Sequence, residues 1–151
     1  MIFLKERMIK MAEYTAVALQ TVAAGQNVIF TESPIPCTRS YVTHRNGSGV
    51  FRLRGVTNQC FARYKVSFGA NISVPTGGTV GPISLAISLE REPQLSATAI
   101  VTPAAVDQFG NVYVSLFVDA HRDCCTTVGI ENTSTQPINV QNANLIVERV
   151  A

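Results

Sequence analysis

Two stretches of the chain place an aliphatic residue at every second position. Ile83–Leu89 alternates Ile or Leu with Ser or Ala, and Val112–Val118 carries Val or Leu at every second position. Successive side chains of an extended strand point to opposite faces, so each stretch predicts a β-strand with one face in a core. Residues 61–73 form a third such stretch, and Leu145 and Val147 continue the pattern near the C-terminus.

Shorter β-prone segments lie between turn signals. Asn46-Gly47 tolerates the positive φ angles of a tight turn, and Glu90–Pro93 predicts a charged hairpin tip. Residues 33–37 hold two prolines and predict a surface crossover, while residues 119–123 predict a polar loop. The other expected strands are residues 14–22, 28–31, 41–44, 50–54, 98–102, 124–130 and 138–150. About nine or ten strands with no sustained helical period predict an all-β sandwich or jelly roll.

The composition fits one domain with an unusually uncharged surface. The chain has 151 residues, of which 15% are charged, against about a quarter in an average protein. A domain of this length buries roughly 70% of its unfolded surface, so no metal or disulfide is expected to be needed for stability. The net charge of +2 and the lack of a basic cluster argue against nucleic acid as a partner. The apolar runs are too short to span a membrane.

The first ten residues differ in character from the rest. They carry Lys5, Glu6, Arg7 and Lys10, and no secretory signal is convincing because these charges break the apolar start at once. We expect residues 1–13 to be an extension outside the native domain and residues 14–151 to be the domain itself. Translation from Met11 is the hypothesis, with Met1 as the alternative. Synthesis in the bacterial cytoplasm with free thiols is expected.

The reactive side chains do not form a recognisable catalytic or metal motif. The chain has four cysteines, and the adjacent pair Cys124-Cys125 lies near His121 and Asp123. Neighbouring strand residues point to opposite faces, so both thiols cannot easily serve one site. We expect no enzyme activity, no metal and no cofactor, with one thiol of the pair in the core and the other at the surface. The remaining cysteines are Cys37 and Cys60, and pairing of Cys60 with either thiol stays open.

Two other sets of polar residues are expected to be unremarkable surface features. His44 follows a short strand beside a turn and predicts a solvated side chain. The Asn-x-Ser/Thr sequons begin at Asn46, Asn71 and Asn132, and without an export signal they are expected to be chance matches.

The order of the strands resembles that of the TNF-like and C1q-like domains. Phe61–Asn71 is similar to a family strand in which an aromatic-Lys-aliphatic run follows a turn. Ile83–Leu89 with Glu90–Pro93 is similar to the hairpin that follows, although Arg91 stands where the family usually has glycine. Asn144–Ala151 resembles the end of the C-terminal domain of the collagen-like spore-surface glycoprotein of bacilli.

This resemblance covers about residues 14–151, in pattern more than in identity. It implies a ten-stranded jelly-roll sandwich that assembles as a homotrimer, with one sheet packed around the threefold axis. The sequence contains no Gly-X-Y repeat, so the resemblance is to a head domain without its collagen stem.

One face of the strand at residues 112–118 favours a partner. Tyr113, Ser115 and Phe117 lie opposite the Val and Leu row, and two aromatic rings on an outward face form an apolar patch. Either another subunit or a loop of the same chain must cover this patch. We expect these three residues to lie in the trimer interface.

The function expected from these features is structural. A trimeric jelly roll would decorate a larger particle, with a bacteriophage virion first and its head decoration, fibre or appendage as the place. The alternatives are a spore-surface protein, or a carbohydrate- or receptor-binding module that recognises a host glycan. The loops expected to bind in that case are residues 37–45, 90–95 and 119–123.

Overall fold

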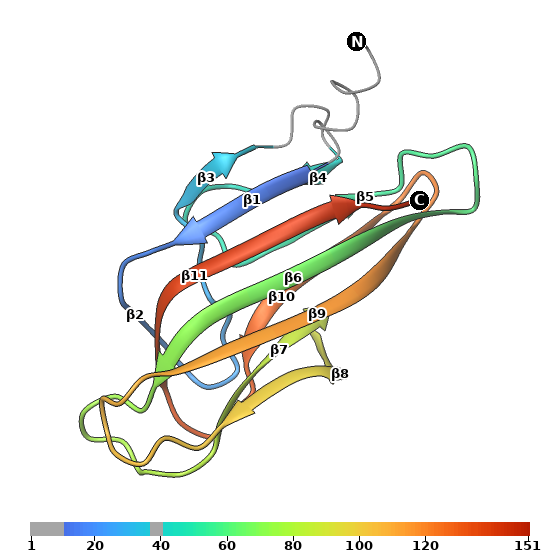
Figure 1. Cartoon of the computed structure of the whole chain (residues 1–151). Helices are drawn as coiled ribbons and strands as arrows, with labels where there is room; N and C mark the ends of the chain where they lie inside the picture. The colour runs from blue at the N-terminus through green and yellow to red at the C-terminus, as the bar shows by residue number, and fades with distance from the viewer. Residues whose placement is uncertain (1–10, 37–40) are drawn as a thin grey trace.

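The computed structural model describes residues 11–36 and 41–151, and all of its regular structure is β (Figure 1). Residues 1–10 and Cys37 lie outside the described residues, so the expectations about the extension and that thiol are not addressed by the fold. The strands are β1 (Met11–Ala16), β2 (Gln20–Val22), β3 (Glu32–Ile35), β4 (Val42–Thr43), β5 (Phe51–Arg54), β6 (Phe61–Ser73), β7 (Ile83–Leu89), β8 (Glu92–Val101), β9 (Gly110–His121), β10 (Cys125–Asn132) and β11 (Ile138–Arg149).

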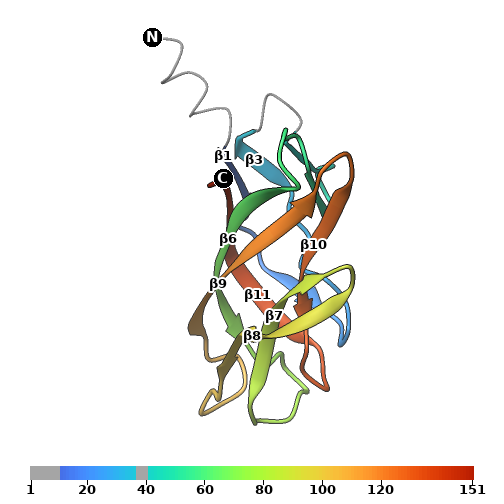
Figure 2. The ribbon, with the colours of Figure 1, turned by 90° about the vertical axis from the view of Figure 1, so that its right-hand side faces the viewer.

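The strands form two antiparallel sheets that pack face to face (Figures 1 and 2). Sheet A has the order β3-β1-β11-β6-β9, with β2 also paired to β11. Sheet B has the order β4-β5-β10-β7-β8. Among the described strands, no neighbours in sheet A are consecutive in sequence, and in sheet B only β4-β5 and β7-β8 are, as in a jelly roll and unlike a simple meander.

The core lies between the sheets and is built from the predicted aliphatic rows. Ile83, Leu85 and Ile87 of sheet B face the apolar row of β6 in sheet A, and all are buried. Full burial of one such side chain stabilises the fold by about 1.5–3 kcal/mol. The buried Tyr64 hydroxyl donates to the backbone carbonyls of Arg54 (2.5 Å) and Tyr41 (3.2 Å), which ties β6 to the opposite sheet.

His44 is half-buried against the aromatic side of this core, so the prediction of a solvated side chain is wrong. Its ring stacks on Phe51 with centroids 4.2 Å apart and meets Tyr14 edge-on at 5.0 Å. Nε2 lies 2.9 Å from the carbonyl oxygen of Ser48, while Nδ1 is buried without a hydrogen-bond partner. The strand period explains this placement. Side chains two positions apart point the same way, and Val42, two positions before His44, is buried.

Several strand limits also differ from those predicted. β9 continues to His121, so most of the expected loop at residues 119–123 is strand. β8 begins at Glu92, which leaves Glu90 and Arg91 as a two-residue turn with φ angles of 51° and 70°. Both positive angles are typical of a type I′ hairpin, which here forms without the usual glycine. The proline-containing segment contributes the edge strand β3, consistent with its exclusion from the sheet centre.

The first described strands are more irregular than predicted. β1 starts at Met11 and pairs with β11 along its whole length, so residues 11–13 belong to sheet A. In place of the expected strand, residues 28–31 make one isolated bridge, between Phe30 and Ser48, and Asn27 just before them makes another with Glu131.

The connection after β5 is held tightly against the connection after β9. The backbone NH of Gly55 donates to the carbonyl of Cys124 (2.9 Å), and Arg122 NH donates to the carbonyl of Cys60 (2.9 Å). A Cβ atom on Gly55 would stand 1.8 Å from the carbonyl oxygen of His121, so a side chain does not fit. Glycine is therefore required at this position for close backbone approach.

We predict that Gly55→Ala lowers the free energy of unfolding by more than about 2 kcal/mol, because one of the two backbone segments must move. Chemical denaturation of the purified protein measures this. Gly81→Ala is the matched control, since nothing lies within 4 Å of a Cβ there, and its effect should stay within about 0.5 kcal/mol. Equal effects of the two substitutions would contradict the close approach.

The stability of the fold is predicted to fall as the pH drops below about 6.5. Burial lowers the pKa of His44 from its usual value, against the opposing contact with the Ser48 carbonyl. The unfolded chain then binds a proton that the folded chain rejects, so stability is present above the unfolded pKa and is lost on acidification.

Thermal unfolding between about pH 7 and pH 5 checks this, in the range where the histidine of the unfolded chain titrates. His44→Phe should flatten the dependence, because it removes the half-buried imidazole. An unchanged slope in the His44→Phe variant would show that another group is responsible.

Candidate functional site

The outward face of β9 carries the two aromatic side chains with the highest exposed fraction on any strand of the described residues. Tyr113 is 64% exposed and Phe117 is 61% exposed, and the exposed Ser115 lies between them. No described part of the chain covers these rings. The alternative in which a loop of the same chain buries them is thus not seen among residues 11–36 and 41–151.

The neighbouring strand makes this face flat. In the register of β6 with β9, Tyr113 lies opposite Gly69 and Ser115 lies opposite Ser67. The Tyr113 ring is 3.7 Å from where a Gly69 Cβ would stand, so the ring has room to lie over the glycine. Small residues therefore lie beside Tyr113, whereas Phe117 lies opposite Lys65, and the part of the face around Tyr113 is where another protein can rest most closely.

An ion pair borders the aromatic face near the end of β9. Arg63 donates two hydrogen bonds to the carboxylate of Asp119, at 2.7 and 3.0 Å. These bonds from Arg63 are the main cause of the lowered pKa of Asp119. Together with Phe117 the pair lines a shallow hollow of about 250 Å³. The pair gives the apolar face a charged rim, which is typical of protein interfaces.

Towards the middle of sheet A the outer face carries polar and charged residues around the single half-buried Ile146. Ile146 of β11 lies opposite Ser67, and Glu148 lies opposite Lys65. On the far side, Asn144 donates a hydrogen bond to the Glu13 carboxylate of β1 (2.8 Å). The aromatic patch is therefore confined to the β9 side of the sheet.

The cysteines do not assemble into a reactive centre. Cys60 and Cys124 are exposed free thiols and Cys125 is a half-buried one, so the expectation of one core thiol in the pair is wrong. The reason is that Cys124 lies in the turn before β10 and Cys125 is the first residue of that strand, so neither thiol reaches the core. The His121 ring packs against Phe61 with centroids 4.7 Å apart.

Two further classes of site can be assessed from the structure. Among residues 11–36 and 41–151, no three His, Cys, Asp or Glu side chains gather where they could hold a metal ion. The sequon at Asn132 is buried, and its amide donates to the carbonyls of Val22 and Gln136, both at 3.0 Å. Nor does any helix in the described part of the chain have the length and hydropathy needed to cross a membrane.

Sequence comparison and structural comparison give different results. No protein-family model matches the chain, and no curated protein sequence matches it either. Solved structures do match over nearly the whole length. The chain is similar to the TNF protein Eiger of S. frugiperda, with 11% identity, 93% and 92% of the two chains covered and a TM-score of 0.69.

Two other matches have the same character. The globular domain of zebrafish complement 1qA protein gives 13% identity, coverage of 93% and 95%, and a TM-score of 0.57. Murine APRIL gives 12% identity, coverage of 92% and 99%, and a TM-score of 0.56. At such low sequence identity these matches show the fold alone. The likeness to the spore-surface glycoprotein stays a prediction. The predicted architecture is confirmed, with eleven strands in place of ten: the chain has the TNF/C1q-like jelly-roll fold.

Proposed function

We propose that the protein is a non-enzymatic structural component that assembles as a homotrimer and decorates a larger particle. The observation that carries the proposal is the exposed aromatic face of β9, where Tyr113 and Phe117 are both more than half exposed. An apolar patch of this kind on a soluble domain marks an interaction surface. Burial of one such ring contributes about 1.5–3 kcal/mol, and a trimer repeats that contribution in each subunit.

A closed ring of three subunits needs a second surface that complements the first, because each subunit contacts its neighbours through different patches. The strand β8 supplies a candidate. Leu95 is 91% exposed and Ile100 is 69% exposed on this strand, which is the edge of sheet B. Figure 2 shows β8 and β9 close together on one side of the sandwich. In the proposed trimer, this side of one subunit packs on the aromatic face of the next.

The charge distribution supports an assembly role. Charged residues make up 15% of the chain, and Lys65 lies at the Phe117 end of the proposed interface. Ser67, Gly69 and Ser115 lie between the two rings of this interface. Such residues carry little desolvation cost compared with Lys or Glu, which protein interfaces tend to exclude from their centres. The Arg63–Asp119 pair remains at the rim, where its charges stay hydrated.

The particle we propose is a bacteriophage virion, in which the protein would form a head decoration, a fibre or an appendage. A spore surface is the alternative location. This choice rests on the low charge of the chain, and it is independent of the fold. Mass spectrometry of purified virions and spores from the source bacterium decides between them.

Light scattering coupled to size-exclusion chromatography tests the trimer. We expect a mass of three times the 16.3 kDa of one chain, and we expect Tyr113→Asp with Phe117→Asp to reduce it to one chain, because buried carboxylates would be unpaired. Val80→Asp is the matched control, since Val80 is an exposed apolar residue outside the strands and its change should leave the mass unaltered. A monomer at micromolar concentration before any substitution would refute the trimer.

A further inference from the structure

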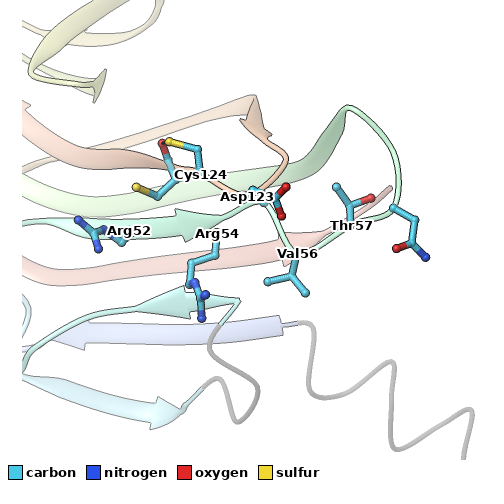
Figure 3. Close-up of a pocket in the computed structure, with 9 residues that line it drawn as sticks. Arg52, Arg54, Val56, Thr57, Asp123 and Cys124 are labelled. Carbon is cyan, nitrogen blue, oxygen red and sulfur yellow. Dashed lines mark hydrogen bonds between the residues drawn. The ribbon is translucent and has the colours of Figure 1, made fainter.

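The outward face of β5 carries two arginines that no acidic side chain neutralises. Phe51 and Leu53 point into the core, so Arg52 and Arg54 point outward together (Figure 3). The ion pairs of the described residues join Arg63 to Asp119 and exposed Arg122 to Asp123, and neither includes these two guanidinium groups. Asp123 lines the same pocket but pairs with Arg122 at 3.7 Å. Two guanidinium groups outside any ion pair attract an anion.

These arginines line a pocket of about 670 Å³. Its other walls are the connection at residues 55–58 and the turn at residues 123–125, which lie side by side because Gly55 permits their close approach. Arg149 fixes the first wall by donating a hydrogen bond to the carbonyl of Val56 (2.6 Å). The volume falls within the range of about 300–1,000 Å³ that is usual for small-molecule sites.

The remaining polar groups of the pocket suit a ligand rich in hydroxyl groups. Thr57, Asn58 and Asp123 line it, and between them they offer both hydrogen-bond donors and acceptors. The carboxylate of Asp123 would repel a phosphate-rich polyanion but accepts hydrogen bonds from hydroxyl groups. None of the lining residues is aromatic, so the base stacking typical of a single-stranded nucleic-acid site is missing.

We infer that this pocket binds an acidic saccharide, with Arg52 and Arg54 holding the sugar carboxylate and the residues of the opposite wall holding its hydroxyl groups. Arginine presents a planar fork of donors that matches a carboxylate through two parallel hydrogen bonds. All of these residues come from one subunit, from β5, the start of β10 and the connections after β5 and β9, and none lies on the outward face of β9. The site is therefore separate from the aromatic face of sheet A and does not depend on the proposed trimer.

Amide NMR titration of the isotope-labelled full chain with sodium glucuronate tests the inference. We expect saturable shifts at residues 55–58 and 123–125. The shifts should be much smaller with glucose, which lacks the carboxylate, and with acetate, which lacks the hydroxyl groups. Arg52→Gln with Arg54→Gln should weaken glucuronate binding at least about tenfold, since charged hydrogen bonds are lost. Arg91→Gln is the matched control, with the same loss of charge on an exposed turn outside the pocket, and should bind normally.

Three results would overturn the inference: no shifts at the pocket with glucuronate, unchanged affinity in the double variant, or inorganic phosphate binding as tightly as glucuronate. The last result would identify a general anion site without saccharide recognition. Light scattering on the same samples keeps the two proposals apart, because a monomer that binds glucuronate refutes the trimer alone, and a trimer that ignores glucuronate refutes the pocket alone.

Discussion

The antiparallel pairing of β6 with β9 is the constraint on which both the core and the outer face depend. Its register runs without a break from Phe61 opposite His121 to Ile72 opposite Gly110. Side chains alternate between faces, so a slip of one residue in β9 would move Tyr113 and Phe117 into the core and expose the valines between them. The same register thus sets both the buried row and the exposed aromatic patch. Interactions that stabilise the buried row therefore also keep Tyr113 and Phe117 on the outer face.

Sequence patterns predicted the central strands well and the ends of strands poorly. The limits of β6 and β7 match the prediction because their alternation is strong and both ends carry turn residues. The end of β9 was missed because Asp119 and His121 looked like loop residues, although each simply faces outward beside the buried Ala120. A polar residue on an exposed strand face and a polar residue in a loop look alike when the partner strand is unknown.

Most of the pocket beside Arg52 and Arg54 escaped prediction for a different reason, although the expected binding loop at residues 119–123 includes Asp123 of its lining. Its walls are joined by backbone contacts between Gly55 and the region of His121 and Cys124, which no local pattern of hydrophobicity reveals. Sequence reasoning named Tyr113, Ser115 and Phe117 for the aromatic face, because alternation along one strand suffices to find them. It missed Arg52 and Arg54, since their significance appears only when β10 pairs with β5 and brings Cys125 opposite Arg54. A site on one face of a single strand can be predicted from the sequence, whereas a site formed between two connections cannot.

The edges of the two sheets differ in how open they are to another chain. β3 contains Pro34, β4 has two residues, and β8 has Pro93 near its start, and each of these features discourages further strand pairing. By contrast, the edge strand β9 is 12 residues long and contains no proline. An open edge of this length in a lone subunit is a template for amyloid-like stacking. A neighbour seated over β9 would shield that edge as well as the rings, so closed assembly would also protect the protein from fibre growth while it is made and stored.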